Sequence, residues 1–372
     1  MRTIITSGVT LQYPDVISFC FNPFLLIATG TSVTAMAVTI TYGSENQSVS
    51  YDALGGSCFA DIREFVQGFF DGAAFGEVDY SKAAKTDLGR NMSFAVAITS
   101  GTSTVVNFNF TSFVVWGALQ VGTTETFNGK RKIRCWRGYP FTIGIYADGK
   151  GSVLMKKNGV PSDWTNITEE GMWNIPLTPA ANADYYILSD VGQHLTEADF
   201  NSGTFDRTFD LTFLGIRVSN TDRIRIDVAT DTETEGKDGV YLRWINRHGA
   251  YCYWLFKKGQ ESRKTATEGE FVRNNMLAYD QSYGYKTGYG RQQGYTRQDT
   301  YPICAPLVDE ETWNFIFDMV TSPVVEMLVS WDGTTAKWTS VTVAAGTFSR
   351  TKDILQDFVA SINLNETPLQ KL

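Results

Sequence analysis

Residues 241–256 read YLRWINRHGAYCYWLF, and this stretch constrains the fold more than any other part of the chain. A break at residues 246–249 (Asn-Arg-His-Gly) divides it into two halves, and apolar side chains recur at every second position on both sides of the break: Val240, Leu242, Trp244, Cys252, Trp254 and Phe256. That period is the spacing of side chains on one face of a β-strand. Asn and Gly readily adopt the positive φ angles of a tight reversal. The stretch therefore predicts an aromatic β-hairpin, with His248 in a solvent-exposed turn.

The composition favours an all-β protein. The 372 residues are 43% hydrophobic and 13% aromatic, which is typical of a globular chain, and only 19% are charged. Abundant Thr, Tyr and Phe, together with 33 glycines, favour strands joined by turns. We predict β-sandwich modules with two short helices. A sparingly charged, aromatic surface is typical of a protein covered by other subunits, although a large aromatic core would give the same composition.

Two modules are predicted. An N-terminal β-sandwich module spans residues 1–220 and contains a poorly defined insertion around residues 148–215. A C-terminal β-rich module spans residues 221–372. Near the N-terminus, residues 16–27 and 33–42 read as two strands, because both are rich in apolar and β-branched side chains.

The spacing of apolar residues predicts one helix in each module. Residues 61–70 (DIREFVQGFF) carry them at helical intervals, with Asp61 as the expected N-cap. Residues 309–320 also carry apolar residues at helical intervals. Asp309 is the expected N-cap, and Ser322-Pro323 is expected to end the helix. A hairpin formed by VVEMLVSW and AKWTSVTV is expected to follow the second helix.

Catalytic, metal and cofactor motifs are missing from the sequence. Only two histidines occur, His194 and His248, and neither a nucleophile elbow, a phosphate-binding glycine loop nor a Cys/His cluster accompanies them. The acidic run at residues 231–236 resembles part of a calcium loop, but Leu242 stands where the twelfth-position carboxylate would be. We therefore predict a non-enzymatic protein without cofactor or metal.

Charge and cysteine usage limit the classes of partner and the cellular compartment that the sequence predicts. A net charge of −8 argues against a nucleic-acid partner, and the first apolar run is too interrupted for a signal peptide or membrane insertion. The five cysteines form no CxxC pair, which favours reduced thiols in a cytoplasm.

Residues 279–301 (YDQSYGYKTGYGRQQGYTRQDTY) are compositionally unusual, with six tyrosines interleaved with four glycines. Tyrosine offers a large amphipathic contact area at a low entropic cost, so this segment reads either as a contact loop for other subunits or a glycan, or as a long hairpin with tyrosines along its edges. We predict partner contacts through residues on the loop and the hairpin: Tyr283, Tyr285, Tyr289, Tyr295, Trp244, His248, Tyr251, Tyr253 and Trp254.

Several stretches together resemble distal-tail and baseplate-type virion structural proteins of tailed bacteriophages and prophages of Bacteroidota. They are FCFNPFLLI (19–27), DIREFVQGFF (61–70), VVWGALQVGTTETFNGKRKIRCWRGYPF (114–141), YLRWINRHGAYCYWLF (241–256) and LVDEETWNFIFDMVTSPVV (307–325). The resemblance implies a homo-oligomeric virion component near the end of the tail, in a distal-tail, baseplate or tail-tip ring of six-fold or three-fold symmetry. It also implies contacts with other tail proteins and assembly in the host bacterial cytoplasm.

Two rival functions stay open. A carbohydrate-binding adhesin or receptor-binding protein would use exposed aromatic platforms for host surface glycans, and Trp164 and Trp173 are its candidate residues. A β-fold glycan hydrolase would work with two carboxylates, whose separation depends on the fold and not on the sequence.

Overall fold

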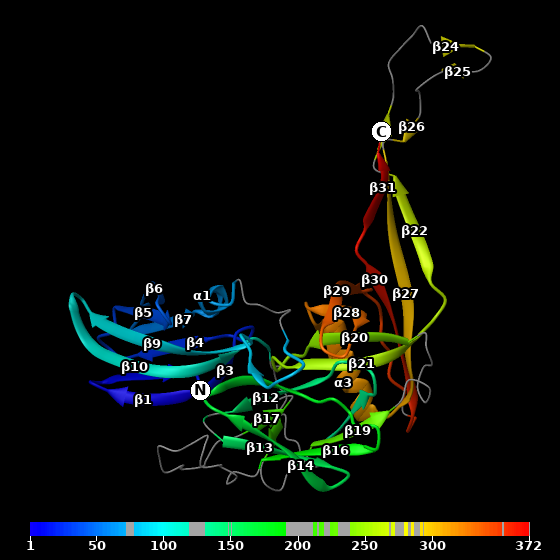
Figure 1. Cartoon of the computed structure of the whole chain (residues 1–372). Coiled ribbons are helices and arrows are strands. Elements are labelled where there is room, and N and C mark those ends of the chain that lie inside the picture. Colours follow the sequence, from blue (N-terminus) through cyan, green and yellow to red (C-terminus); the bar gives the residue numbers. More distant parts are fainter. Residues whose placement is uncertain are drawn as a thin grey trace. The chain divides into compact units, whose positions relative to one another are not determined.

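The computed structural model describes residues 1–71, 78–118, 131–147, 149, 151–190, 211–213, 216–218, 224–229, 239–267, 269–271, 279–281, 284–285, 291–292, 294–351 and 353–371. Strands dominate these residues, and two short helices accompany them, α1 (Arg63–Gly68) and α3 (Glu310–Thr321) (Figure 1). The predicted all-β fold with two short helices is confirmed. No helix in the described ranges is long and apolar enough to cross a membrane.

The chain divides into two compact units. Unit 1 comprises Met1–Ala229, Ile245–Cys252 and Gly333–Thr335, and unit 2 comprises Thr230–Trp244, Tyr253–Asp332 and Ala336–Leu372. The long first stretch of unit 1 thus ends at Ala229, whereas the sequence placed the module boundary at residue 220. The tip of the aromatic hairpin belongs to unit 1, and the bases of its strands belong to unit 2.

Unit 1 begins with a sandwich of two sheets. The first sheet has the order β1 (Arg2–Thr6), β2 (Val9–Tyr13), β4 (Leu25–Thr29), β7 (Ser57–Asp61). The second has the order β3 (Ile17–Phe19), β10 (Ser103–Val115), β9 (Gly89–Ser100), β5 (Ala35–Tyr42), β6 (Glu45–Asp52). Alternate residues of both sheets are buried, and Phe94 stacks between Phe24 and Phe110 at centroid distances of 5.1 and 4.8 Å. This aromatic stack lies in the core of the N-terminal sandwich.

Two sequence predictions in the N-terminal sandwich are wrong in detail. Residues 16–27 do not form one strand, because the chain leaves β3 at Phe19, passes Asn22-Pro23 and enters β4 in the other sheet. The N-cap of α1 is Ile62 and not Asp61. The Asp61 carboxylate instead accepts hydrogen bonds from the backbone N–H groups of Phe24 (3.0 Å) and Arg63 (3.1 Å), so it joins the start of β4 to the start of the helix.

Two more five-stranded sheets complete unit 1. One has the order β11 (Arg131–Trp136), β19 (Ile224–Ala229), β16 (Tyr185–Asp190), β13 (Gly151–Lys157), β14 (Val160–Ile167). The other has the order β18 (Ile216–Val218), β17 (Leu211–Phe213), β12 (Thr142–Ala147), β15 (Gly171–Pro176), β8 (Ala84–Lys85). Every residue of β12 is buried, so this strand is covered on both faces. The described part of the expected insertion around residues 148–215 therefore supplies strands of these two sheets.

Unit 2 is built on one large sheet. Its order is β21 (Tyr251–Lys258), β20 (Gly239–Ile245), β28 (Val325–Trp331), β29 (Ala336–Val343), β30 (Gln356–Leu364), β27 (Gly294–Val308), β22 (Ser262–Thr267), with β31 (Thr367–Lys371) also paired to β27. The short pairs β23 (Glu270–Phe271) with β26 (Arg291–Gln292) and β24 (Tyr279–Asp280) with β25 (Gly284–Tyr285) lie beyond it.

Helix α3 follows the sequence prediction closely. The Asp309 side chain accepts a hydrogen bond from the backbone N–H of Thr312 at 2.8 Å and Ser322 is the C-cap, so both predicted ends are confirmed. Trp313 packs edge-on against Phe358 of β30, with ring centroids 5.5 Å apart, and so fixes the helix on the sheet. The predicted hairpin after the helix is confirmed as the antiparallel pair β28–β29.

Candidate functional site

The five hairpin residues assigned to partner contacts are all buried within the chain. None of the side chains of Trp244, His248, Tyr251, Tyr253 and Trp254 exposes more than 7% of its surface. In unit 2, Trp244 packs on Phe315 (5.4 Å between ring centroids) and Tyr253 lies 6.3 Å from Trp338. The alternation in the sequence predicted one covered face, but both faces of β20 and β21 are covered. These side chains act as core, and partner contact by them stays a prediction.

The predicted turn of the hairpin exists, but it is not exposed to solvent. The Asn246 side-chain oxygen accepts hydrogen bonds from the N–H groups of His248 and Ala250, and Gly249 has φ +72°. The Arg247 carbonyl accepts a 2.8 Å hydrogen bond from Ala118, and a Cβ on Gly117 would lie 2.1 Å from that oxygen. The expectation of an exposed His248 is therefore wrong, because the turn packs closely against other backbone of unit 1.

The predicted loop tyrosines lie largely outside the described residues. Tyr283 and Tyr289 are outside them, and for Tyr285 only the backbone is described, paired with Tyr279 in the β24–β25 hairpin. Tyr295 lies at the start of β27 and exposes 42% of its surface. Of the four loop tyrosines, Tyr295 is therefore the one that the structure places at a surface.

The two candidate glycan-binding tryptophans differ in what the structure describes. Trp173 is buried on β15, and its indole N–H donates to the carbonyl of Glu169 at 3.2 Å, so it offers no exposed aromatic platform. Trp164 pairs through its backbone with Leu154 in the β13–β14 hairpin, and its side chain lies outside the described residues.

The most distinctive surface is a ribbon of three strands that projects from the sheet of unit 2 (Figure 1). It consists of β22, the first half of β27 and β31, with β22 pairing from Ser262↔Thr300 to Thr267↔Tyr295. All six residues of β22 are exposed, and none of residues 295–300 of β27 is buried. The β22–β27 pair therefore has backbone hydrogen bonds but no core of its own.

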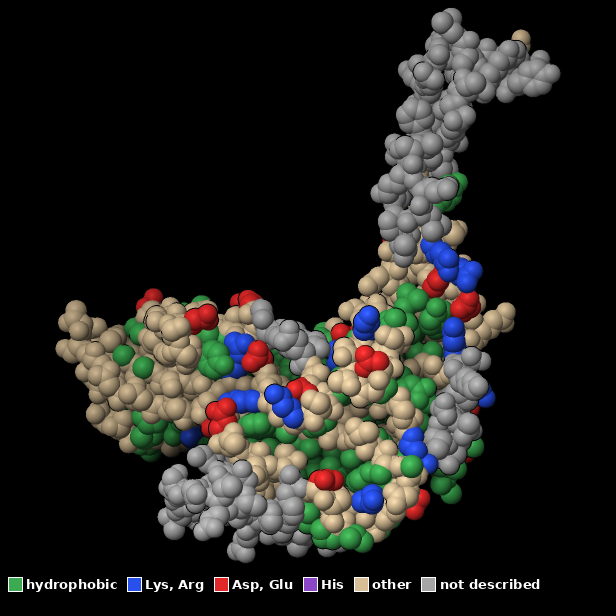
Figure 2. Space-filling view, viewed as in Figure 1, with side chains coloured by type: hydrophobic (Ala, Val, Ile, Leu, Met, Phe, Trp, Pro, Cys, Tyr) green, Lys and Arg blue, Asp and Glu red, His purple; other side chains and the backbone are tan. Residues whose placement is uncertain are grey.

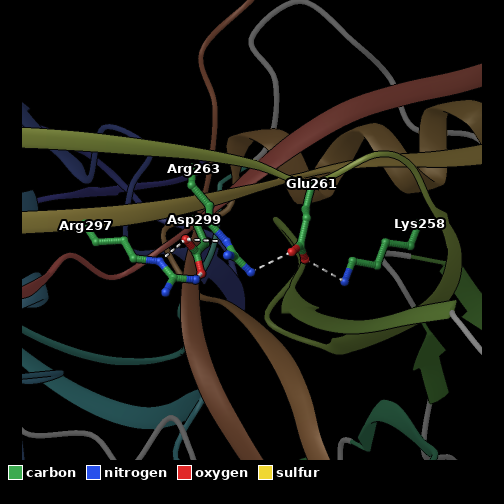
Figure 3. Close-up of polar contacts among 5 residues, drawn as sticks. All are labelled: Lys258, Glu261, Arg263, Arg297 and Asp299. Atoms are coloured by element: carbon green, nitrogen blue, oxygen red, sulfur yellow. Dashed lines mark hydrogen bonds and ion pairs between the residues drawn. The ribbon is translucent and has the colours of Figure 1, made fainter.

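A ladder of ion pairs runs along the base of the ribbon (Figure 3). Glu261 lies between Lys258 (3.3 Å) and Arg263 (2.9 Å). Asp299 lies between Arg263 (3.9 Å) and Arg297, whose guanidinium donates two hydrogen bonds of 2.6 and 2.5 Å to its carboxylate. These bonds lower the pKa of Asp299 and raise the pKa of Arg297. The sequence reading missed this ladder, although Glu261/Arg263 and Arg297/Asp299 each have the two-residue spacing of one strand face.

Next to the ladder, a groove of about 470 Å³ opens on the sheet of unit 2. The Lys258 ammonium lies 4.1 Å from the centre of the Tyr301 ring, a cation–π contact at the mouth of this groove. Lys257 and Lys264 are exposed nearby and form no ion pair in the part of the chain that the structure describes. The base of the ribbon therefore carries five cations and two anions, in a chain whose net charge is −8.

Chemistry elsewhere in the described ranges is limited. They contain no group of three His, Cys, Asp or Glu side chains placed to hold a metal ion, and the acidic run at 231–236 lies outside them. Burial raises the pKa of the Cys20 and Cys135 thiols to about 12, so these two cysteines are poor nucleophiles at neutral pH.

Comparison with known proteins gives no family. No family model matches the chain, and no curated protein matches it. Solved structures with some similarity are the periplasmic chaperone SfaE (12% identity, 60% of this chain and 100% of that chain, TM-score 0.19) and fibronectin(III)-like modules of CbhA from Clostridium thermocellum (12%, 60% and 95%, TM-score 0.16). A third structure belongs to work on the host cell surface retention of a 1.5-MDa bacterial ice-binding adhesin. The match covers 89% of this chain and 95% of that chain, at 11% identity and a TM-score of 0.18. Similarity at this level carries no functional argument.

Proposed function

We propose that the protein is a non-enzymatic structural subunit of a bacteriophage tail, in a distal-tail, baseplate or tail-tip ring. It assembles in the bacterial cytoplasm with copies of itself and with other tail proteins, and it links the tail tube to the parts that recognise the host. Two lines support this proposal: the sequence resemblance to such proteins over five stretches, and the ribbon of unit 2.

The ribbon is the observation that carries the structural part of the proposal. A strand pair whose side chains are exposed or only half-buried gains little stability from the hydrophobic effect, and isolated hairpins are marginally stable in water. In this chain the β22–β27 pair nevertheless continues from the edge of a well-packed sheet. Such an element becomes stable when a partner covers it, which is what a subunit inside a larger assembly requires.

The test removes the three strands of the ribbon and keeps the strands of the unit 2 sheet. Lys258 pairs directly with Ile303, so residues 259–302 can be replaced by a two-residue Asn-Gly turn that closes the β21–β27 hairpin, and the chain can be ended at Glu366 so that β31 is removed with its partner. Ile362 and Asn363 of β30 lose their β27 partners but keep their pairing with β29. We expect the shortened protein to fold, with its Trp313–Phe358 contact retained. We expect full-length protein, alone or with other tail proteins, to form closed rings in negative-stain class averages, and the shortened protein to form none.

The adhesin hypothesis predicts a different result. The full-length protein would stay a monomer under every condition and would bind host surface glycan. That outcome would contradict the tail-subunit proposal. Turnover of a polysaccharide by the purified monomer would instead favour the hydrolase.

A further inference from the structure

Strand β22 forms an open edge of the sheet of unit 2. Within the residues that the structure describes, β22 pairs with β27 on one side and has no strand on its other side (Figure 1). The pairing continues from Ser262 to Thr267 without a register shift, and the β22 side chains are all exposed. An edge strand presents unpaired backbone N–H and C=O groups along its free side. β22 therefore offers a regular edge, roughly 20 Å long, at which another strand can pair.

Most of the features that block pairing at a sheet edge are missing from β22. Its sequence, SRKTAT, contains no proline, and its pairing with β27 contains no β-bulge. The one such feature that it has is positive charge, on Arg263 and Lys264. Cationic side chains at an edge disfavour pairing with a basic or an uncharged strand, but they attract an acidic one. The charges of β22 therefore select the kind of strand that can pair with it.

The charge around this edge is positive in excess. In Figure 2 Lys and Arg side chains gather, with Asp and Glu among them, where the ribbon leaves the sheet. The cations are Lys257, Lys258, Arg263, Lys264 and Arg297, and the anions are Glu261 and Asp299. Each carboxylate is shared by two cations, whereas Lys257 and Lys264 have no ion pair among the described residues. The surplus of positive charge complements acidic side chains.

The groove of about 470 Å³ lies at one end of the β22 edge. Glu261, which directly precedes β22, is part of its wall. The Lys258 ammonium and the Tyr301 ring, 4.1 Å apart, form another part. The remaining wall is largely apolar and comes from the start of β20 and from β28, with Val240, Tyr241, Met327 and Leu328. A strand paired with β22 can therefore place an apolar side chain in the groove.

We infer that β22 binds an extended acidic segment of a partner protein by strand addition. The backbone of the segment hydrogen-bonds to the free side of β22, its carboxylates lie beside Lys264 and Arg263, and an apolar side chain at one end enters the groove. A polypeptide fits this edge better than a nucleic acid or a sulphated polysaccharide, because those polymers have no regular ladder of N–H and C=O groups. The inference deepens the proposed function and rests on it only in treating the ribbon as the assembling surface.

The test uses a fluorescent peptide of alternating Thr and Glu with Phe at both ends, titrated with full-length protein. We expect saturable binding that weakens as salt is added, because exposed charges supply part of the affinity. A peptide with Lys in place of Glu should not bind, and the protein that lacks the ribbon should bind neither peptide. Lys264→Glu should weaken binding about tenfold. Lys82→Glu, the same change at an exposed position of unit 1, is the matched control and should leave binding unchanged.

A second measurement separates strand addition from charge attraction. The Thr/Glu peptide methylated at every backbone nitrogen keeps its charge but can donate no hydrogen bond to β22. We expect it to bind at least about tenfold more weakly than the unmethylated peptide. Amide exchange of residues 262–267 should become slower when the unmethylated peptide is bound, because pairing protects the N–H groups on the free side of β22.

Other outcomes would overturn the inference. Equal binding of the two peptides, or unchanged exchange of residues 262–267, would mean that charge alone attracts the peptide. Dextran sulphate that binds where the peptide does not would reassign the site to an anionic polysaccharide. If the protein builds rings that the ribbon replacement abolishes, but binds no acidic peptide, the proposed function stands and this inference fails. If the peptide binds as expected and no rings form under any condition, the inference stands and the proposed function fails.

Discussion

The N-terminal sandwich of unit 1 and the ribbon of unit 2 are both antiparallel β-structure, but different forces hold them. The sandwich buries a stack of Phe24, Phe94 and Phe110 between two sheets and leaves its outer faces almost uncharged. In the β22–β27 pair of the ribbon the residues of β22 are exposed and residues 296–300 are only half-buried, and the pair carries a ladder of ion pairs. Hydrophobic burial is the larger stabilising term, and exposed ion pairs contribute little. The comparison teaches that the burial of aromatic side chains holds the sandwich together, whereas backbone hydrogen bonds and ion pairs hold the β22–β27 pair.

The largest expected effect is a difference in unfolding free energy when one aromatic side chain is removed from each region. Phe94→Ala removes the centre of the aromatic stack and should lower the free energy of unfolding of unit 1 by about 4 kcal/mol. Tyr295→Ala, at a position 42% exposed on the ribbon, should change stability by less than about 0.5 kcal/mol. Chemical denaturation of both variants checks this. Equal losses would show that the ribbon has a core of its own.

The next prediction compares a buried ion pair in the sheet of unit 2 with an exposed ion pair in the ribbon. Arg243 is buried, its guanidinium lies 4.4 Å from the centre of the Trp338 ring, and it pairs with Glu326 at 2.7 Å. Glu326→Gln removes the charge that balances this buried cation and should cost about 3 kcal/mol in the unfolding of unit 2. A matched change in the ribbon, Glu261→Gln, should cost far less, because its carboxylate is exposed. Comparable losses of unfolding free energy in the two variants would show that the ion pair in the sheet of unit 2 contributes no more than the exposed ion pair in the ribbon.

A smaller effect is expected at the N-cap of α3. Asp309→Ala removes the acceptor for the Thr312 N–H and should destabilise unit 2 by about 1 kcal/mol. Asn314→Ala, at an exposed position in the same helix, is the control and should cause no loss. Thermal unfolding of the two variants measures the difference. A neutral Asp309→Ala would mean that the Trp313 packing alone holds the helix.

The smallest effect concerns acid and salt at the ribbon. The bonds from Arg297 lower the pKa of Asp299, so its contribution is fully present above the usual value of 3.8 and is lost as the pH falls through the lowered value. Acid below about pH 3.8 and high salt should therefore loosen the ribbon slightly around Arg297, and Asp299→Asn should abolish this response of the Arg297 side chain while the Glu261 ion pairs keep theirs. Nuclear magnetic resonance of the Arg297 side chain at several pH values checks this. A response that persists in Asp299→Asn would assign it to another group.

The sequence predicted those elements that depend on residues close together in the chain. The hairpin at 241–256, the Asp309 cap and the β28–β29 pair all follow from alternation, cap chemistry and turn residues. Burial of the hairpin did not follow, because the second covered face of β20 depends on Trp338 and Glu326, which are distant in the sequence. The uncharged outer rows across β6, β5, β9 and β10 were missed for the same reason. Alternation of Ala, Ser, Thr and Asn in four separate strands carries no signal until pairing aligns the rows.

The most direct test of the comparison is amide hydrogen exchange of the full-length protein, followed by mass spectrometry at low and at assembling concentrations. Exchange reports the free energy of local opening along the chain. We predict slow exchange for β5 and β9 under both conditions. Residues 262–267 and 295–300 should exchange fast in the monomer and slowly once the protein assembles. Ribbon amides as protected as those of β9 in the monomer, or still exposed in the assembly, would contradict the account.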